Sequence, residues 1–314
     1  MNSASPLLLF CSIQLAVIVP FGAGLLLRRR FRDPQRTTRS LVRLNIAGLE
    51  PLIVLWCVWD LKVHVGVLLL PCAGFFLALL GLGLGALLLP LTGLTGRSRQ
   101  TFLISGTLSN HGFTLGGFLC YMLLGEIGLG YAIFLVLYFM PYVFGFIFPA
   151  ARLAGSRNGP GRTRWRDFVL APQNVPLAAL FAAIALGLLD VPRPLIAVPL
   201  TPLMFISIGL YYFTLGITFR GVDIFRSFRP HVCLCLIKFI LVPGSVWALL
   251  RLSAVDTCMQ SVIMIQACMS TAIYSVITSL LFDLDERLAS AMFVVNTVVC
   301  LVVVVPLLFL FIPV

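Results

Sequence analysis

The chain has 314 residues, of which 60% are hydrophobic and only 11% are charged, whereas soluble domains carry about 25% charged residues. A mean hydropathy of +1.08 excludes a soluble globular protein, because one core would have to bury about ten long apolar runs. The net charge is +11, but the basic residues lie in short loops and form no stripe interleaved with aromatic residues, which excludes nucleic acid as a partner. The composition therefore indicates a polytopic membrane protein, and we expect no cofactor and no metal.

Ten apolar runs are candidates for membrane-spanning helices, since a ~30 Å hydrocarbon core needs roughly 20 helical residues. The first run follows no positively charged region and precedes four arginines, so we interpret it as an uncleaved helix rather than a signal peptide. The spans are Pro6–Leu27, Leu44–Trp59, Val65–Leu89, Thr101–Leu124, Gly128–Ala151, Val169–Leu189, Leu195–Phe219, Val232–Leu250, Met259–Phe282 and Leu288–Phe311.

The distribution of Lys and Arg predicts the orientation of these spans. The loops after the odd-numbered spans carry 18 basic residues, whereas the loops after the even-numbered spans carry three, namely Lys62, Arg193 and Arg251. Cytoplasmic loops of membrane proteins are enriched in Lys and Arg. We therefore expect a protein of the cytoplasmic (plasma) membrane with both termini outside, and Asp285 is expected to cap the last span.

A Gly- and Arg-rich linker near the middle of the chain divides the spans into two groups of five. We predict a first repeat over residues 1–155, a cytoplasmic linker over 156–168 and a second repeat over 169–314. Because each repeat has an odd number of spans, the second enters the membrane in the opposite direction. Pro51 in span 2 and Pro202 in span 7 agree weakly with this inverted repeat.

Span 4 has a polar centre, Ser105–Gly117, which contains Asn110, His111 and several glycines. Unsatisfied polar groups in hydrocarbon cost several kcal/mol each, so a helix facing lipid would not carry this stretch. We interpret span 4 as a broken helix that lines a cavity, the arrangement by which secondary transporters bind substrates. Span 9 has a matching polar stretch from Gln266 to Ser275, for which a continuous helix with hydroxyls bonded to its own carbonyls is the alternative.

Several stretches resemble the auxin efflux carrier family, in its bacterial form, within the bile acid and anion transporter superfamily. They are Asn110–Gly117, Tyr212–Gly216, Lys238 with Pro243, and Asp283–Thr297. The resemblance implies ten helices in two inverted repeats, with helices 4 and 9 discontinuous and crossing, and a small organic anion bound near the crossing. The family usually breaks these helices at prolines. Here Gly117 and Ser270 stand at the expected positions, so we expect less sharply broken helices.

A broken helix presents free N–H groups and a positive dipole end, which favour an anion. Asn110 either contacts the substrate or caps the first half-helix, and His111 either carries a coupling proton or is neutral and packed. The predicted substrate-binding residues are Ser109, Asn110, His111, Gly112, Thr114, Gly116, Gly117, Gln266, Ser270, Thr271 and Tyr274.

Three further residues are candidates for coupling, because ionisable groups at membrane depth are costly and often functional. Glu50 precedes Pro51 in span 2, and it either exchanges a proton or forms an ion pair with Lys238 of span 8. Asn45 lies about one turn before Glu50 and belongs to the same expected polar patch.

The sequence thus predicts an all-α secondary active transporter of a small organic anion such as a carboxylate, working by efflux or proton coupling and by alternating access. It is not expected to be an enzyme, since it has no P-loop and no set of catalytic side chains at membrane depth. A ligand-binding membrane sensor and, less favoured, an intramembrane enzyme are the alternatives. Membrane lipid is the other expected partner, and a homodimer through lipid-facing helices is left open.

Overall fold

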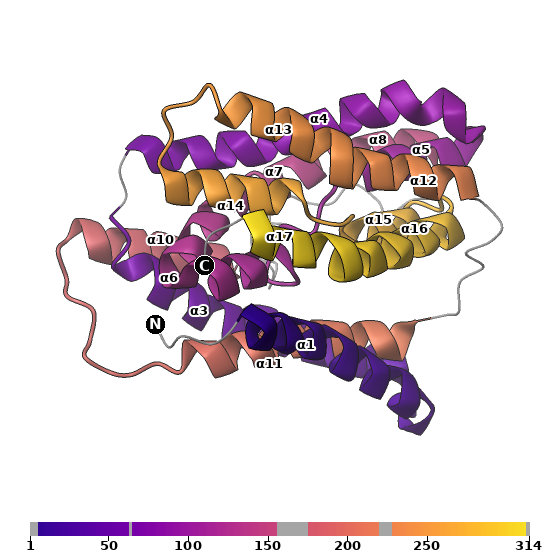
Figure 1. Cartoon of the computed structure of the whole chain (residues 1–314). Coiled ribbons are helices and arrows are strands. Elements are labelled where there is room, and N and C mark those ends of the chain that lie inside the picture. The colour runs from indigo at the N-terminus through magenta and orange to yellow at the C-terminus, as the bar shows by residue number, and fades with distance from the viewer. Residues whose placement is uncertain (1–5, 63–64, 156–174, 220–227, 312–314) are drawn as a thin grey trace. The chain divides into compact units, whose positions relative to one another are not determined.

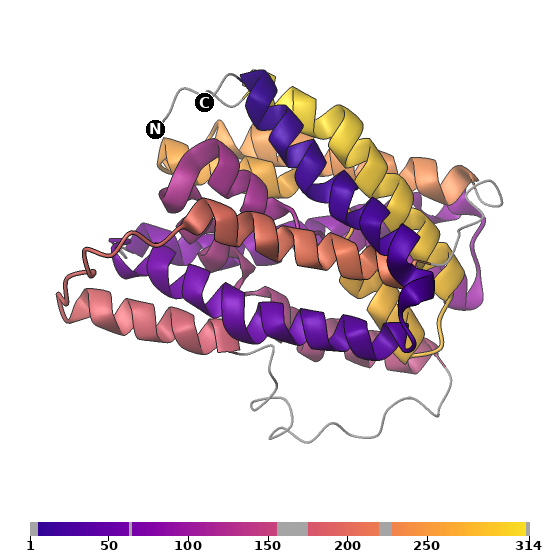
Figure 2. The same ribbon diagram turned by 90° about the horizontal axis from the view of Figure 1, so that it is seen from below.

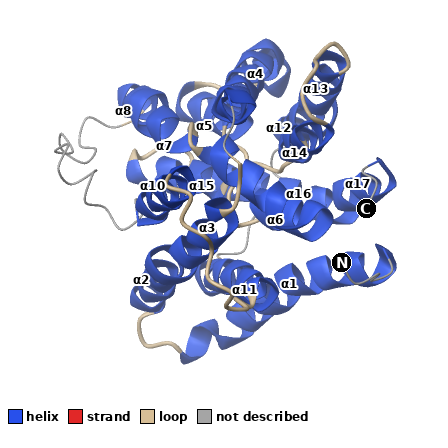
Figure 3. Cartoon of the chain, turned by 90° about the vertical axis from the view of Figure 1, so that its left-hand side faces the viewer, coloured by secondary structure: helices blue, strands red, loops and turns tan. Residues whose placement is uncertain are grey.

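The computed structural model describes residues 6–62, 65–155, 175–219 and 228–311. Within these residues the regular structure is helical, and no strand is formed (Figure 3). Seven of the described helices are long and apolar enough to cross a membrane, and α10 is a shorter apolar helix. The prediction of an all-helical membrane protein is confirmed at this level. The predicted linker, 156–168, lies outside the described residues.

The chain forms two compact units, each of which takes segments from both halves of the sequence. Unit 1 comprises Met1–His64, Gly112–Ile133 and Thr163–Arg220, and unit 2 comprises Val65–His111, Phe134–Arg162 and Gly221–Val314. Neither unit therefore coincides with one of the predicted repeats. The helices of unit 1 are α1 Pro6–Leu27, η1 Arg28–Arg30, α2 Pro34–Leu44, η2 Asn45–Leu49, α3 Glu50–Trp59, α10 Val175–Leu188, α11 Leu200–Thr218 and most of α6 Gly116–Val136.

Residues 228–311, which are coloured orange to yellow in Figure 1, belong to unit 2. One of its apolar runs, the predicted span 9, is divided into two helices. The elements are η3 Val65–Leu68, α4 Leu69–Thr92, α5 Gly96–Thr107, α7 Phe139–Tyr142, η4 Val143–Ile147, α8 Phe148–Ala154, α12 Phe228–Leu236, η7 Ile237–Leu241, α13 Val242–Leu250, α14 Thr257–Ala267, α15 Ile273–Leu281, α16 Glu286–Val299, η8 Cys300–Val304 and α17 Val305–Phe311.

The second span is longer than predicted. Its helix begins at Pro34 and not at Leu44, because Asp33 Oδ1 accepts a hydrogen bond from the Arg36 N–H at 2.9 Å. A capping aspartate followed by proline at the first helical position is a strong helix start. The prediction placed this stretch in a loop, because its polar composition was given more weight than these two signals. The predicted cap at Asp285 is confirmed, since its Oδ1 accepts from the Leu288 N–H at 3.0 Å.

Four spans contain a π-helical turn of five residues, and each turn lies directly before a residue–proline pair. Proline has no N–H to donate, and its ring clashes with the carbonyl four residues earlier, so the helix widens while remaining continuous. The turns are η2 before Glu50-Pro51, η4 before Phe148-Pro149, η7 before Val242-Pro243 and η8 before Val305-Pro306.

Unit 1 is built from two helix pairs, α1 with α11 (Figure 1) and α3 with α10 (Figure 2). In the first pair Gly24 faces Gly216, and a Cβ on either would overlap the carbonyl oxygen of Phe213 or Phe21 on the facing helix. In the second pair, a Cβ on Gly187 would lie 3.0 Å from the Trp59 carbonyl oxygen. Glycine therefore permits close backbone contact in both pairs.

In unit 2, α4 packs along α5 and α13 packs on α14. Gly81 of α4 lies against the Gly106 carbonyl, where a Cβ would not fit. Next to this contact, Thr107 Oγ1 donates to the Ala78 carbonyl at 2.6 Å and shares a hydrogen bond of 2.7 Å with the Tyr142 hydroxyl. The end of α5 is thus fixed against two neighbouring elements.

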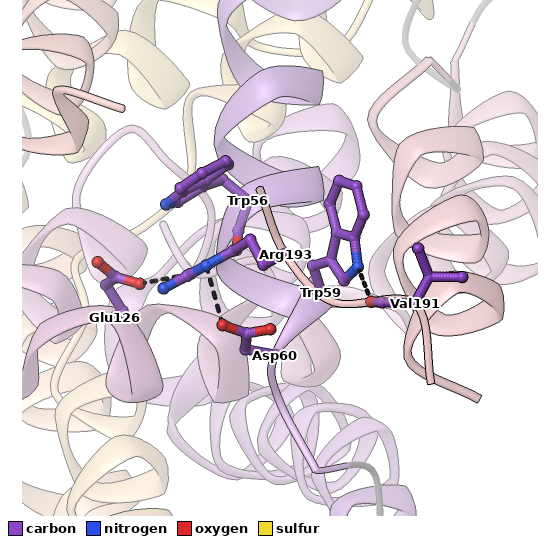
Figure 4. A network of polar contacts seen from close by, with 6 residues as sticks. All are labelled: Trp56, Trp59, Asp60, Glu126, Val191 and Arg193. Atoms are coloured by element: carbon purple, nitrogen blue, oxygen red, sulfur yellow. Dashed lines mark hydrogen bonds and ion pairs between the residues drawn. The ribbon is translucent and has the colours of Figure 1, made fainter. Parts of the chain in front are cut away.

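An ion-pair cluster in unit 1 joins the end of α3, the kink in α6 and the connection between α10 and α11 (Figure 4). Arg193 Nε lies 2.9 Å from Asp60 Oδ2, and Nη1 lies 3.0 Å from Glu126 Oε2. The guanidinium also stacks on the Trp56 ring at 4.7 Å, while Trp59 Nε1 donates to the Val191 carbonyl at 2.8 Å. Asp60, Glu126 and Arg193 follow predicted spans 2, 4 and 6, which the charge count places on one side of the membrane.

Further contacts within each unit join segments that follow odd-numbered spans. In unit 2, Arg97 pairs with Asp283 at 2.8 Å and Ser98 Oγ donates to Asp285 at 2.7 Å. In unit 1, Arg28 Nη1 donates to the Phe219 carbonyl at 3.0 Å. Each of these contacts joins two segments that the predicted topology places on the same side of the membrane.

Candidate functional site

Two helices are interrupted in the middle of apolar segments. The first interruption separates α5, which ends at Thr107, from α6, which begins at Gly116. The second separates α14, which ends at Ala267, from α15, which begins at Ile273. The alternative of a continuous helix in span 9 is therefore wrong, and both interruptions form without proline.

The two interruptions pair with each other through their backbones. Ser109 and Thr271 lie opposite one another as an isolated antiparallel pair. The Asn110 N–H donates to the Ser270 carbonyl at 2.8 Å, and the Ala272 N–H donates to the Leu108 carbonyl at 3.0 Å. Non-helical backbone at membrane depth must have its polar groups satisfied inside the protein. Mutual pairing meets this requirement and explains why neither break needs a proline.

Lys238 supports the first break from the π-helical turn η7. Its side chain is 2% exposed, and Nζ donates to the Leu108 carbonyl at 3.1 Å and to Ser109 Oγ at 2.7 Å. Thr271 Oγ1 also donates to Leu108 O, at 3.1 Å, and to Ser105 O, at 2.5 Å. A cation is favourable at this position, because the C-terminal end of α5 carries a partial negative charge.

His111 lies beside this pairing in a packed environment. Its Nδ1 lies 2.9 Å from the Tyr138 hydroxyl oxygen, to which it is hydrogen-bonded, and the residue is buried. Tyr274, at the start of α15, packs edge-on against Phe139 with ring centroids 5.1 Å apart. The two interpretations of His111 drawn from the sequence, a coupling proton and a neutral packed ring, both stay predictions.

The hydroxyl groups near the second break fall into two groups. Ser275 Oγ and Thr278 Oγ1 donate to carbonyls of their own helix, those of Ala272 at 2.8 Å and Tyr274 at 2.7 Å. Ser270 Oγ is fully buried and has no hydrogen-bond partner among the described residues. Ser270 therefore retains hydrogen-bonding capacity next to the paired backbones.

The predicted substrate residues are divided between the two units. Unit 2 holds Ser109, Asn110, His111, Gln266, Ser270, Thr271 and Tyr274. The remaining predicted residues, Gly112, Thr114, Gly116 and Gly117, belong to unit 1. Gly117 lies in the first turn of α6 and not at the break, and its N–H donates to the Gly112 carbonyl at 2.9 Å.

The predicted coupling residues Glu50 and Asn45 lie in unit 1, whereas Lys238 lies in unit 2. Glu50 Oε1 accepts a hydrogen bond from the Tyr211 hydroxyl at 2.5 Å, and Asn45 Nδ2 donates to the Ser207 carbonyl at 3.1 Å. Each residue of the proposed Glu50–Lys238 ion pair thus has other partners inside its own unit. Asn45 and Glu50 both face α11, as expected for one polar patch.

Sequence reasoning missed Tyr211, Ser207 and Tyr138 as partners of the predicted site residues. Each lies in an apolar run, and its contact is formed by the packing of helices against one another. Arg193 was noted only as a basic loop residue, and its two carboxylate partners come from the end of α3 and from α6. The sequence carries no local signal for these tertiary contacts.

No family model matches the chain, and no curated protein is significantly similar to it. The resemblance to auxin efflux carriers therefore rests on the quoted stretches of sequence alone.

Proposed function

We propose that this protein is a secondary active transporter of a small organic anion, with ten membrane crossings in two inverted five-helix repeats. The observation that carries the proposal is the antiparallel pairing of two helix breaks at Ser109 and Thr271, each within an apolar helix. Paired discontinuous helices at membrane depth are the usual substrate site of such transporters.

The seven long helices, the two broken ones and the shorter apolar helix α10 make up the ten crossings of this proposal. The segment Gly116–Ala154 is interrupted at Gly125, whose φ of 69° and ψ of −156° are not helical. It supplies the second half of the fourth crossing and the whole of the fifth. The crossings are α1, α2–α3, α4, α5 with early α6, late α6–α8, α10, α11, α12–α13, α14 with α15, and α16–α17.

Three features of the two units support the inverted repeat. The backbone pairing is symmetric about Ser109 and Thr271. The α1–α11 contact joins crossings 1 and 7, and the α3–α10 contact joins crossings 2 and 6. The repeat relates crossing 1 to 6 and crossing 2 to 7, so it turns one contact into the other. Crossings 5 and 10 both carry a π-helical turn before a proline, Pro149 or Pro306.

The charge and the donors at the paired breaks favour an anion. Lys238 is the charged side chain bonded to the break, and an ammonium group has three N–H donors. Two of these reach Leu108 and Ser109, which leaves one for a ligand carboxylate. Helix ends at the breaks add N–H groups, while Asn110 and Ser270 add polar side chains.

Division into two units supports transport by alternating access. Each unit draws on both repeats, and the chain passes from unit 2 to unit 1 between His111 and Gly112, inside the first break. A movement of one unit against the other would therefore act directly on the break. Rocking of one helix bundle against another is the general mechanism of transporters built from inverted repeats.

The test is thermal stability of the purified protein against a panel of mono- and dicarboxylates. A ligand at 100-fold excess over its Kd stabilises the folded state by about 2.7 kcal/mol. We expect at least one carboxylate to raise Tm, and the shift to disappear in Asn110→Ala. Asn296→Ala is the matched control, because Asn296 is a buried asparagine of unit 2 whose Nδ2 donates to Cys235 Sγ and not to a residue of either break.

Uptake into proteoliposomes then separates transport from binding. Accumulation of the stabilising carboxylate supports a transporter, whereas binding without uptake favours a membrane sensor. A flat thermal response to every carboxylate would contradict the assignment of an organic anion as substrate.

A further inference from the structure

A second polar cluster lies inside unit 1, between the α2–α3 helix and α11. It consists of two facing pairs, Asn45 with Ser207 and Glu50 with Tyr211. Asn45 is 0%, Ser207 1% and Glu50 7% exposed. Both helices belong to the apolar segments long enough to cross a membrane. The cluster thus places a carboxyl group and three neutral oxygen-bearing side chains between apolar helices.

The π-helical turn η2 brings Asn45 and Glu50 to the same side of their helix. The Glu50 N–H donates to the Asn45 carbonyl across the widened turn, which Pro51 imposes because it lacks an N–H. Ser207 and Tyr211 are four residues apart on α11 and also share a helix face. The two pairs therefore lie one above the other between the same two helices.

The cluster has unused acceptors and few donors. Among the described residues, Asn45 Oδ1 and Ser207 Oγ have no hydrogen-bond partner. Asn45 Nδ2 is already used on the Ser207 carbonyl, so its oxygen is the atom left over. A buried polar atom without a partner costs about 1–3 kcal/mol. A proton on Glu50 would supply only one donor, whereas a cation interacts with several oxygens at once.

We propose that this cluster binds a monovalent alkali cation, Na⁺, through the Glu50 carboxylate, Asn45 Oδ1 and Ser207 Oγ. Hard cations prefer carboxylate, amide and hydroxyl oxygens. One carboxylate balances one positive charge, whereas a divalent ion would leave net charge in an apolar site. The Tyr211 hydroxyl orients the carboxylate by donating to Oε1.

Cation binding at this site does not depend on the proposed function. Only the coupling of the cation to anion transport rests on the proposed transporter. The residues of the cation site all belong to unit 1, whereas the paired breaks and Lys238 belong to unit 2. Cation binding and anion binding can therefore be removed by different substitutions and measured separately.

The test compares Tm of the full-length protein in sodium chloride and in N-methyl-D-glucamine chloride at equal ionic strength. We expect Na⁺ to raise Tm in the unmodified protein and to have no effect in Glu50→Gln, which keeps an acceptor for Tyr211. Ser207→Ala keeps the main-chain carbonyl that bonds Asn45 and is expected to weaken Na⁺ binding about tenfold, the loss of one good ligand contact. Asn45→Leu should lose the rise of Tm caused by Na⁺. Asn296→Leu in unit 2 is its control and should retain the full rise.

Equal Tm in the two salts would overturn the proposal, as would a full sodium shift in both Glu50→Gln and Ser207→Ala. A sodium-independent response to pH that Glu50→Gln abolishes would assign the cluster to a proton instead. Repeating the carboxylate panel on Glu50→Gln in sodium-free buffer separates the two proposals. A persisting carboxylate shift leaves the anion site intact if the sodium site fails.

Discussion

The paired breaks of unit 2 and the polar cluster of unit 1 bury polar groups in different ways. In unit 2 the backbone groups that lose their helical partners at the breaks bond to each other. The Leu108 carbonyl accepts from Ala272, Thr271 and Lys238. In unit 1 the helices stay continuous, but Asn45 and Ser207 keep oxygen atoms with no partner among the described residues. We infer that polar groups at the paired breaks both maintain the fold of unit 2 and hold a ligand, whereas in unit 1 close helix packing maintains the fold and the polar cluster serves a ligand.

Replacing Lys238 is expected to have the largest effect, because this residue combines both roles. Lys238→Met removes the cation proposed to hold the substrate, and a charge-assisted hydrogen bond contributes about 2–3 kcal/mol. We expect carboxylate affinity to fall about 100-fold, measured as the ligand concentration needed for a given rise in Tm. Lys62→Met, in a loop of unit 1, is the control and should leave affinity unchanged. Unaltered affinity in a folded Lys238→Met protein would remove Lys238 from the anion site.

The next effect tests whether packing maintains unit 1. Gly24→Ala places a methyl group on the Phe213 carbonyl, which is backbone and cannot move aside as a side chain would. We expect a loss of about 2 kcal/mol in unfolding free energy, typical of overpacking. Gly22→Ala is the matched control on α1, because nothing lies within 4 Å of its added Cβ. Equal stability of the two variants would show that the α1–α11 contact is not close.

A smaller effect tests whether hydrogen bonds maintain unit 2. Thr271→Val keeps the shape of the side chain but removes its donations to Ser105 and Leu108. We expect a loss of about 1–2 kcal/mol, the upper part of the range for polar contacts in membrane proteins. Thr278→Val, on the same side of the break, loses only a bond to the Tyr274 carbonyl of its own helix and should cost less. Thermal unfolding in detergent measures both, and equal losses would contradict a special role for Thr271.

The two breaks also differ in how far the sequence could predict them. Glycines with Asn110 and His111 identify the first, since such residues do not fit a helix facing lipid. The second consists of hydroxyl residues that also fit a continuous helix, and Ser275 and Thr278 do bond to their own helix. Ser270 and Thr271 depart from it because the first break offers partners, and a partner distant in sequence leaves no local pattern.

In unit 1, the sequence identified Glu50 by its depth in an apolar segment but did not identify Tyr211. That pairing follows from the packing of α11 against the α2–α3 helix, which requires the fold. The widened turn at Asn45–Leu49 was also missed, although Pro51 provides a local cause for it. The beginning of α2 was misjudged because charge was given more weight than the Asp33 cap.

The smallest expected effect concerns Arg193, whose cluster looks like a strong polar network (Figure 4). Its side chain is 25% exposed, and those of Asp60 and Glu126 are 54% and 46% exposed, so water and salt screen both ion pairs. We expect Arg193→Gln to lower the unfolding free energy by less than about 1 kcal/mol. Arg97→Gln is the control, since Arg97 and Asp283 are 51% and 65% exposed and should contribute even less. Unfolding measured at low and high salt distinguishes the contributions, because the ion pairs weaken with salt while stacking on Trp56 does not. A loss in Arg193→Gln larger than that in Gly24→Ala would mean that polar contacts, and not close packing of glycines, maintain unit 1.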